Sequence, residues 1–346
     1  MNAGSSAEIL THVEPGGVGV ITLNRPAKIN ALTDTMLGAI EDALDRWEDD
    51  DGIVGIVLHG TGDRGFCAGG DIASIHGHGR DDPAASIDVW HREYRGVLRL
   101  SRFRTPIVSL LDGLAMGAGI GLGGHVSLRV VTERSVVGMP ETLIGLTPDA
   151  GGSFLLSRAP GELGTHLALT GRAMSGADAL VTGFADVFVP ATVLPDIPHA
   201  LATGGLDGVR ALAVAPPMSE LDGARVWIDE AYRGDDALAI VARLRALEAT
   251  GIAEAGRSAD DIEAASPTSV VVTLAAQRRA RALPDLESVL GQELGLVSAL
   301  AGQHDLYEGI RARVIDKDRR PAWSPATLDA VDVDAVLARI DWDAHL

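Results

Sequence analysis

Apolar and polar residues follow two different rhythms along the first half of the chain. Residues 18–23 (VGVITL) are a largely apolar run that predicts a strand, and Asn24-Arg25-Pro26 ends it. Residues 34–48 instead place apolar side chains every three or four positions, which predicts an amphipathic helix. The apolar face of this helix comprises Met36, Leu37, Ile40, Leu44 and Trp47.

The same two patterns alternate as far as residue 190. Further apolar runs predict strands at 53–59, 106–111, 128–131, 136–138 and 186–189. The segments between them predict helices at 84–102, 117–125, 161–170 and 175–182. Strands that alternate with helices indicate an α/β fold.

Beyond residue 190 strand-like runs are rare, and Ala, Leu, Glu and Arg dominate. Helices are predicted at 222–232, 235–250, 267–282 and 285–301. We therefore expect a core over residues 1–190 and a mainly helical region over 191–346. The helical region carries many apolar positions, so we expect it to cover the site or to join copies of the chain in a homo-oligomer.

Composition narrows the function classes. The chain has 48 Asp and Glu against 29 Lys and Arg, a formal charge of −19, so nucleic acid is not an expected partner. The single cysteine, Cys67, excludes an internal disulfide and a cysteine-based structural zinc site. The N-terminus shows no basic segment followed by an apolar stretch, which favours a cytoplasmic location.

One segment is apolar over a membrane-spanning length. Pro106 to Gly124 is nearly apolar, but Asp112 lies within it and glycines fill its second half. This composition favours a buried strand followed by a glycine-rich turn. No membrane partner is expected.

Two stretches match the dinucleotide-binding pattern G-x-G-x-x-G, which makes a nucleotide-dependent enzyme a rival hypothesis. They are Gly60-Gly62-Gly65 and Gly119-Gly121-Gly124. Neither lies in the first strand–helix–strand unit, and tight turns explain them better. His76 and His78 suggest a metal, but without neighbouring carboxylates a solvated loop is the better interpretation, so no metal site is expected.

Two glycine-rich loops and two carboxylates form the informative pattern. One loop, residues 65–71, and a second, residues 116–119, each follow a strand and can present backbone N–H groups to a carbonyl oxygen. Glu141 and Asp149 come next, between apolar runs and the Gly151-Gly152 turn. Oxyanion donors beside a carboxylate pair suit acyl-transfer chemistry.

Four segments together resemble the crotonase superfamily of acyl-CoA enzymes in order and spacing. They are GFCAGGD at 65–71, MGAGIGL at 116–122, MPETLIGLTPDAGGSFLLSR at 139–158 and LALTGRAMSGADAL at 167–180. The resemblance implies a spiral core of repeated ββα units with a helical C-terminal region.

Within the superfamily the chain is similar to the 3-hydroxyisobutyryl-CoA hydrolase branch. Pro148-Asp149 stands where hydratases carry a glycine-containing turn, and Gly121 stands where they carry their first catalytic glutamate. The segments 266–269 (SPTS) and 305–318 extend the likeness toward the C-terminus. The implied reaction is hydrolysis of the 3-hydroxyisobutyryl-CoA thioester, a step of valine breakdown, with coenzyme A entering as part of the substrate and without a metal or other cofactor.

The resemblance also implies residue roles. The N–H groups of Gly70 and Ala118 would hold the thioester oxygen, Glu141 would be nucleophile or base, and Asp149 would bind the substrate hydroxyl or orient water. Glu93, which on its own would be interpreted as a solvated helix charge, would contact substrate. The residues implied for coenzyme A are Lys28, Ile29, Ala68, Asp71 and Ile72.

Two alternatives stay open at this point. A hydratase or isomerase on the same fold would lack one catalytic glutamate because of Gly121. A catalytically silent acyl-CoA-binding protein would not need both Glu141 and Asp149. Ala118 departs from the glycine expected there, and its methyl group narrows the site.

Overall fold

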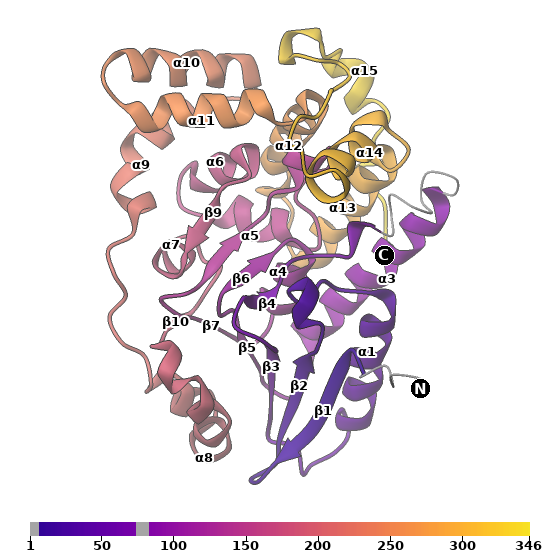
Figure 1. Ribbon diagram of the computed structural model, residues 1–346, viewed down its shortest axis with the longest axis vertical. Helices are drawn as coiled ribbons and strands as arrows, with labels where there is room; N and C mark the ends of the chain where they lie inside the picture. Colours follow the sequence, from indigo (N-terminus) through magenta and orange to yellow (C-terminus); the bar gives the residue numbers. More distant parts are fainter. Residues whose placement is uncertain (1–6, 74–82) are drawn as a thin grey trace.

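A larger and a smaller β-sheet form the centre of the molecule (Figure 1). The computed structural model describes residues 7–73 and 83–346. Neighbouring strands of the larger sheet are, in order, β1 (Ile9–Glu14), β2 (Val18–Leu23), β3 (Gly55–Gly60), β5 (Ile107–Leu110), β7 (Leu128–Val131) and β10 (Val187–Phe188). β1 runs antiparallel to β2, and the other neighbours are parallel.

Along the middle of the chain, consecutive strands alternate between the larger sheet and the smaller one. Its order is β4 (Gly65–Cys67), β6 (Leu114–Met116), β8 (Val136–Gly138) and β9 (Ala173–Ser175). β3 and β4, β5 and β6, and β7 and β8 are consecutive pairs that each add one strand to both sheets. Along the chain, α3 (Pro83–Arg102) comes after the first pair and α4 (Ala118–Gly123) after the second. The expected spiral of ββα units on an α/β fold is confirmed.

The amphipathic helix predicted at 34–48 is α1 (Asp34–Trp47), and all five apolar positions predicted for its inner face are buried. The Thr33 side chain caps its first turn by accepting a hydrogen bond from the Met36 N–H at 3.1 Å. Trp47 lies flat against β2, where a Cβ atom on Gly19 would come within 2.8 Å of the indole ring. Glycine at this strand position therefore makes room for the largest side chain of the helix.

Further helices pack around the second half of the core. They are α5 (Gly152–Arg158), α6 (Leu163–Thr170), α7 (Gly176–Val181) and α8 (Ile197–Arg210). α8 lies against the β2 and β3 side of the larger sheet. The structure thus adds a helix where the sequence pattern left residues 191–221 unassigned.

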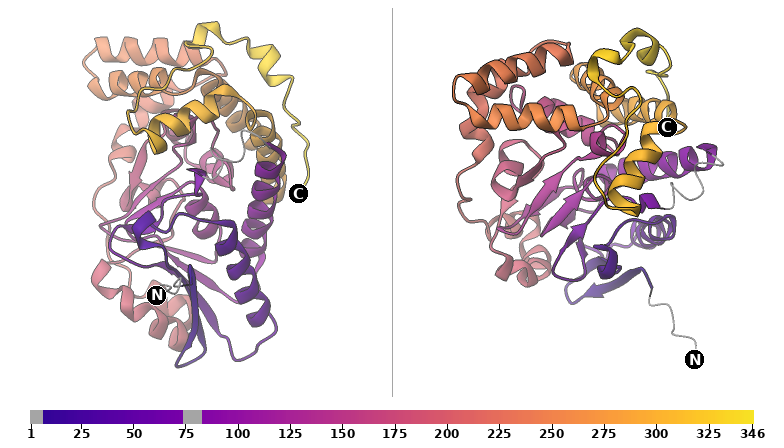
Figure 2. Two further views of the ribbon diagram at one scale, coloured as in Figure 1. Left: turned by 45° about the vertical axis from the view of Figure 1, so that its right-hand side comes forward. Right: turned by 45° about the horizontal axis from the view of Figure 1, so that its top comes forward.

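The C-terminal helices gather at one end of the molecule (Figure 2). They are α9 (Glu220–Ala231), α10 (Ala237–Ala249), α11 (Ala253–Ala264), α12 (Pro267–Ala280), α13 (Leu286–Leu300), α14 (His304–Ile310) and α15 (Val333–Leu337). α12 packs on α5 and α6, and α13 packs on α3 and α5. The four helices predicted in this region are present, and α8, α11, α14 and α15 are additional.

Leu290 on α13 tests how firmly this end is packed. Its side chain is fully buried in a cluster with Trp90 and Tyr94 of α3. We expect Leu290→Ala to lower the free energy of unfolding by about 2–5 kcal/mol, because it removes buried methyl groups and leaves a cavity. Urea unfolding measures the change, with half-exposed Leu238→Ala as the control, expected within about 0.5 kcal/mol. Equal effects of the two substitutions would contradict this packing.

Candidate functional site

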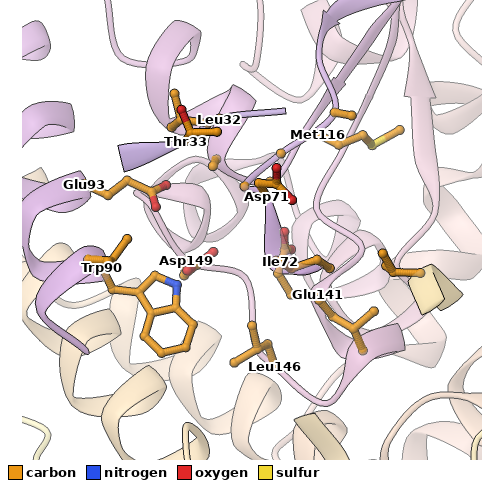
Figure 3. Close-up of a pocket in the computed structure, with 18 of the residues that line it drawn as sticks. Leu32, Thr33, Asp71, Ile72, Trp90, Glu93, Met116, Glu141, Leu146 and Asp149 are labelled. Carbon is orange, nitrogen blue, oxygen red and sulfur yellow. The ribbon is translucent and has the colours of Figure 1, made fainter. Parts of the chain in front are cut away.

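A cavity of about 470 Å³ opens where loops after three successive strands of the smaller sheet meet (Figure 3). The residue 68–72 loop follows β4, Met116 to Ala118 close β6 and open α4, and the segment from Pro140 to Asp149 follows β8. α3 forms one wall through Trp90 and Glu93. The ββα repeat therefore brings together three segments of the chain: the first and second are about fifty residues apart, and the second and third about twenty-five.

The two glycine-rich loops lie against each other. A Cβ atom on Gly70 would be 4.0 Å from the Cβ atom of Ala118, and Gly69 and Gly117 have positive φ angles of 106° and 50°. Side chains at these two positions would be strained, so the chain turns sharply here only because both are glycine. No hydrogen bond within the described part of the chain uses the N–H group of Gly70 or Ala118. Both groups can donate to a ligand.

Glu141 stands directly beside this turn. It begins the 3-10 helix Glu141–Ile144, its side chain is buried, and its Oε1 would lie 2.7 Å from a Cβ atom on Gly117. Its Oε2 accepts no hydrogen bond from the described residues. Burial, and then the charge of Asp149, raise the pKa of Glu141 well above its ordinary value. An unpaired, desolvated carboxylate oxygen of this kind is a strong base or nucleophile.

Asp149 is the second carboxyl group at the cavity. The Tyr94 hydroxyl donates a hydrogen bond of 2.8 Å to its Oδ2. Burial raises the pKa of Asp149 to about 6, and the Tyr94 hydrogen bond opposes this rise. Asp149 therefore changes its protonation close to neutral pH.

Glu93 is the third. It lies on α3 and is 7% exposed, so the interpretation as a solvated helix charge is wrong. Figure 3 shows its carboxyl group directed toward the same space as that of Asp149. Burial, followed by the charges of Asp149 and Glu293, raises the pKa of Glu93 well above its ordinary value. Ionisation of one of these carboxyl groups therefore raises the pKa of its neighbours, and the groups do not titrate independently.

The residues expected to hold coenzyme A divide into two groups. Ala68, Asp71 and Ile72 line the cavity, whereas Lys28 and Ile29 do not. Ile29 lies just behind the lining, since its carbonyl oxygen accepts a 2.9 Å hydrogen bond from the Ala68 N–H, and Lys28 is exposed. Asp71 forms a 3.0 Å ion pair with Arg25, which fixes the loop rather than leaving this carboxylate for a ligand.

Some residues of the site were not found from the sequence. Trp90 and Tyr94 on α3 are two of them, and Arg313 and Val314 at the C-terminal side of the cavity are two more. The first pair had a signal, because Trp90, Tyr94 and Val97 recur at helical spacing within an otherwise polar segment. Arg313 and Val314 reach the cavity only through tertiary packing.

Gly121 has a clear structural role. It is buried in α4, and a Cβ atom there would lie 2.8 Å from the Ala150 Cβ and 3.1 Å from the Val97 Cγ2. The space that a longer side chain would need is occupied by Ala150, the neighbour of Asp149. The described cavity therefore has no carboxyl group at this position.

The rival motifs are accounted for by packing. A Cβ atom on Gly119 would lie 2.7 Å from the Cys67 carbonyl oxygen, and one on Gly60 would lie 2.5 Å from the Phe66 carbonyl oxygen. These glycines allow close approach of backbones, as the turn interpretation expected. Cys67 is a buried free thiol whose pKa burial raises to about 12.

Metal and membrane sites were also considered. Within residues 7–73 and 83–346, no group of three or more His, Cys, Asp or Glu side chains is arranged to hold a metal ion. His76 and His78 lie outside the described residues. Of the helices that the structure describes, none has the length and apolar character to cross a membrane.

Comparison with known proteins gives concordant results. The family model of enoyl-CoA hydratase/isomerase matches residues 18–340. A mitochondrial 3-hydroxyisobutyryl-CoA hydrolase of Gallus gallus is 37% identical, covering 94% of this chain and 87% of its own. The Homo sapiens protein of that name is 35% identical, covering 94% and 86%.

Solved structures add a second set of names. A carnitinyl-CoA dehydratase from Mycobacterium thermoresistibile superposes with a TM-score of 0.91 at 44% identity, covering 98% of both chains. An enoyl-CoA hydratase from Rhodobacter sphaeroides 2.4.1 superposes with a TM-score of 0.90 at 40% identity, covering 96% of this chain and 97% of its own.

The relatives correct one expectation and establish the family. The cytoplasmic location expected from the sequence is contradicted, because the similar hydrolases from Gallus gallus and Homo sapiens are mitochondrial proteins. The family model covers nearly the whole chain, and the relatives match it at more than 30% identity over most of their length. The chain belongs to the enoyl-CoA hydratase/isomerase family of the crotonase superfamily.

Proposed function

We propose that the protein hydrolyses the thioester of 3-hydroxyisobutyryl-CoA, giving 3-hydroxyisobutyrate and coenzyme A. The observation that carries the proposal is the arrangement of Glu141 beside the free N–H groups of Gly70 and Ala118, with Asp149 lining the same cavity. The similar curated proteins are named for this hydrolysis.

The chemistry follows from these groups. The thioester oxygen accepts hydrogen bonds from the Gly70 and Ala118 N–H groups, which stabilise the negative charge that develops as the carbonyl carbon is attacked. Glu141 Oε2 takes a proton from water, whose oxygen forms the new bond to that carbon. The carbon–sulfur bond then breaks, and Glu141 returns the proton to the departing thiolate. Water is divided between acid and thiol, and no electrons are exchanged.

Asp149 and Glu93 supply substrate recognition in this proposal. Both residues line the cavity that also contains Gly70 and Ala118, and Figure 3 shows the two carboxyl groups directed into the same space. A carboxyl pair that shares a proton offers both an acceptor and a donor to the 3-hydroxyl group of the acyl chain.

Direct attack by Glu141 on the thioester is a second route with the same catalytic groups. It gives an anhydride that water then hydrolyses.

Hydration or dehydration is the second candidate function, because the two solved structures of high similarity carry those names. The two-glutamate mechanism of water addition requires a second carboxylate, and Gly121 with Ala150 behind it leaves none there. Thiol release from a panel of 3-hydroxyacyl-CoA esters, measured beside hydration of crotonyl-CoA, distinguishes the two. Rapid hydration without thiol release would overturn the hydrolase proposal, and absence of both would favour a silent acyl-CoA-binding protein.

Glu141→Gln preserves the shape of the side chain and removes its ability to accept a proton. We expect kcat for thiol release to fall at least about a hundredfold, the lower range for loss of a general acid–base group. Glu287→Gln, an exposed substitution on α13, is the control and should leave kcat unchanged. A nearly fully active Glu141→Gln protein with intact secondary structure would remove catalysis from this site.

The effect of Asp149→Asn should depend on whether the substrate carries the 3-hydroxyl group. It replaces one acceptor oxygen by an amide donor, so recognition of a hydroxyl group suffers while the oxyanion turn remains intact. We expect kcat/KM to fall at least about tenfold for 3-hydroxyisobutyryl-CoA and less than threefold for isobutyryl-CoA. Equal losses on both thioesters would show that Asp149 serves the chemical step instead.

A further inference from the structure

The turn that carries Asp149 has an unusual backbone. Ala150 and Gly151, the two residues that follow Asp149, both have positive φ angles, 50° and 84°. The left-handed region is unfavourable for alanine, because its Cβ atom crowds the backbone. The Gly152 N–H closes the turn on the Asp149 carbonyl oxygen at 2.7 Å, and the Ser153 hydroxyl donates to the Pro148 carbonyl oxygen at 2.8 Å. Such a turn persists only where neighbouring groups hold it.

Glu293 of α13 is the group that holds it. Its Oε2 accepts a 2.7 Å hydrogen bond from the Gly151 N–H, and its Oε1 accepts one of 2.9 Å from the Ser153 N–H. These N–H groups open α5, whose N-cap residue, Gly151, has no side chain to cap it. A side-chain carboxyl group about 140 residues further along the chain therefore acts as the helix cap.

Burying the Glu293 carboxyl group costs free energy, which indicates that this residue does more than fill space. Glu293 is fully buried, and no ion pair among the described residues includes it. Burial raises its pKa to about 8, against the opposing effect of the two backbone hydrogen bonds. A buried carboxyl group without a cation destabilises a fold relative to a well-packed apolar residue. Its benefit lies in the geometry it imposes on residues 149–153.

Tyr94 holds the other side of the same residue. Its side chain is fully buried on α3, and its hydroxyl donates to Asp149 Oδ2. α3 and α13 pack on each other, so the two groups that hold Asp149 and its turn belong to neighbouring helices. The backbone of the turn is set from α13, and the carboxyl orientation is set from α3.

We propose that Glu293 is a positioning residue, which fixes the 149–153 turn so that Asp149 meets the substrate hydroxyl group. The expected effect of Glu293 on turnover rests on the proposed function, whereas its expected effect on the conformation of residues 149–153 does not. Glu293→Gln replaces one acceptor oxygen by an N–H donor, which would face a backbone N–H donor and displace the turn.

A double-mutant cycle separates positioning from a general structural role. We expect Glu293→Gln to lower kcat/KM for 3-hydroxyisobutyryl-CoA at least about tenfold in the natural protein and less than twofold in the Asp149→Asn protein, because the effect passes through Asp149. Equal fold losses in both backgrounds would overturn the proposal. Glu287→Gln, on the same helix but exposed, is the matched control and should leave kcat/KM unchanged in both.

Amide hydrogen exchange tests the turn without substrate. We expect the peptide spanning residues 149–153 to exchange at least about tenfold faster in Glu293→Gln than in the natural protein, and at an unchanged rate in Glu287→Gln. Unchanged exchange in Glu293→Gln would overturn the proposal whatever the activity. If the natural protein releases no thiol, the proposed function fails and exchange still decides the role of Glu293. Glu293→Asp, too short to reach both N–H groups, gives the same comparison if Glu293→Gln does not fold.

Discussion

The cost of burying carboxyl groups without cations governs this site. Glu93, Glu141, Asp149 and Glu293 are all buried, and none belongs to an ion pair among the described residues. An isolated buried carboxylate is strongly disfavoured, so such a group keeps its proton or finds hydrogen-bond donors. Glu293 finds two backbone N–H groups, Asp149 finds the Tyr94 hydroxyl, and Glu141 keeps one oxygen unpaired. These differences in hydrogen bonding suggest different tasks for chemically similar groups.

The fold builds the site around these buried carboxyl groups from backbone turns that surround one cavity. Consecutive ββα units place the 68–72 loop, the Met116–Ala118 turn and the Pro140–Asp149 segment around one cavity. Glycine at 69 and 117 permits the sharp turns, and glycine at 121 leaves room for Ala150 beneath Asp149. The C-terminal helices then exclude water from the carboxyl groups, since α13 and α3 close the cluster. The packing that buries the carboxyl groups thus also sets the backbone geometry of the turns around the cavity.

Much of this could be predicted from the sequence because the signals are local. The periodicity of residues 34–48 predicted α1, and the apolar run 18–23 predicted β2. The motifs between 65 and 152 indicated two glycine-rich loops beside Glu141 and Asp149, and the family resemblance then assigned Gly70 and Ala118 within those loops. The strands β4, β6 and β9 are three residues long and were not predicted, whereas β8, which is equally short, was predicted at 136–138. Here the repeated ββα architecture came from family resemblance and not from periodicity.

Other parts depend on tertiary contacts that leave no local pattern. Glu93 lies on a helix of mostly polar sequence, and its burial follows from tertiary packing, which includes the contact of α3 with α13. Glu293 lies in the apolar segment LGQELGLV, and its role becomes visible only from its hydrogen bonds to the start of α5. Lys28 and Ile29, expected to hold coenzyme A, lie outside the lining of the cavity, and the Ile29 carbonyl oxygen supports Ala68 from behind.

Infrared spectroscopy of the carboxyl groups in the ligand-free protein tests the central claim most directly. Asp149 has a pKa of about 6 and Glu293 of about 8, and burial raises the pKa values of Glu93 and Glu141 well above their ordinary range. Raised pKa values mean that the folded protein retains protons that exposed carboxyl groups lose near pH 4. We predict a protonated-carboxyl band at pH 7 that weakens above about pH 8 and is reduced in Glu293→Gln. A spectrum at pH 7 with every carboxyl group ionised would contradict the account.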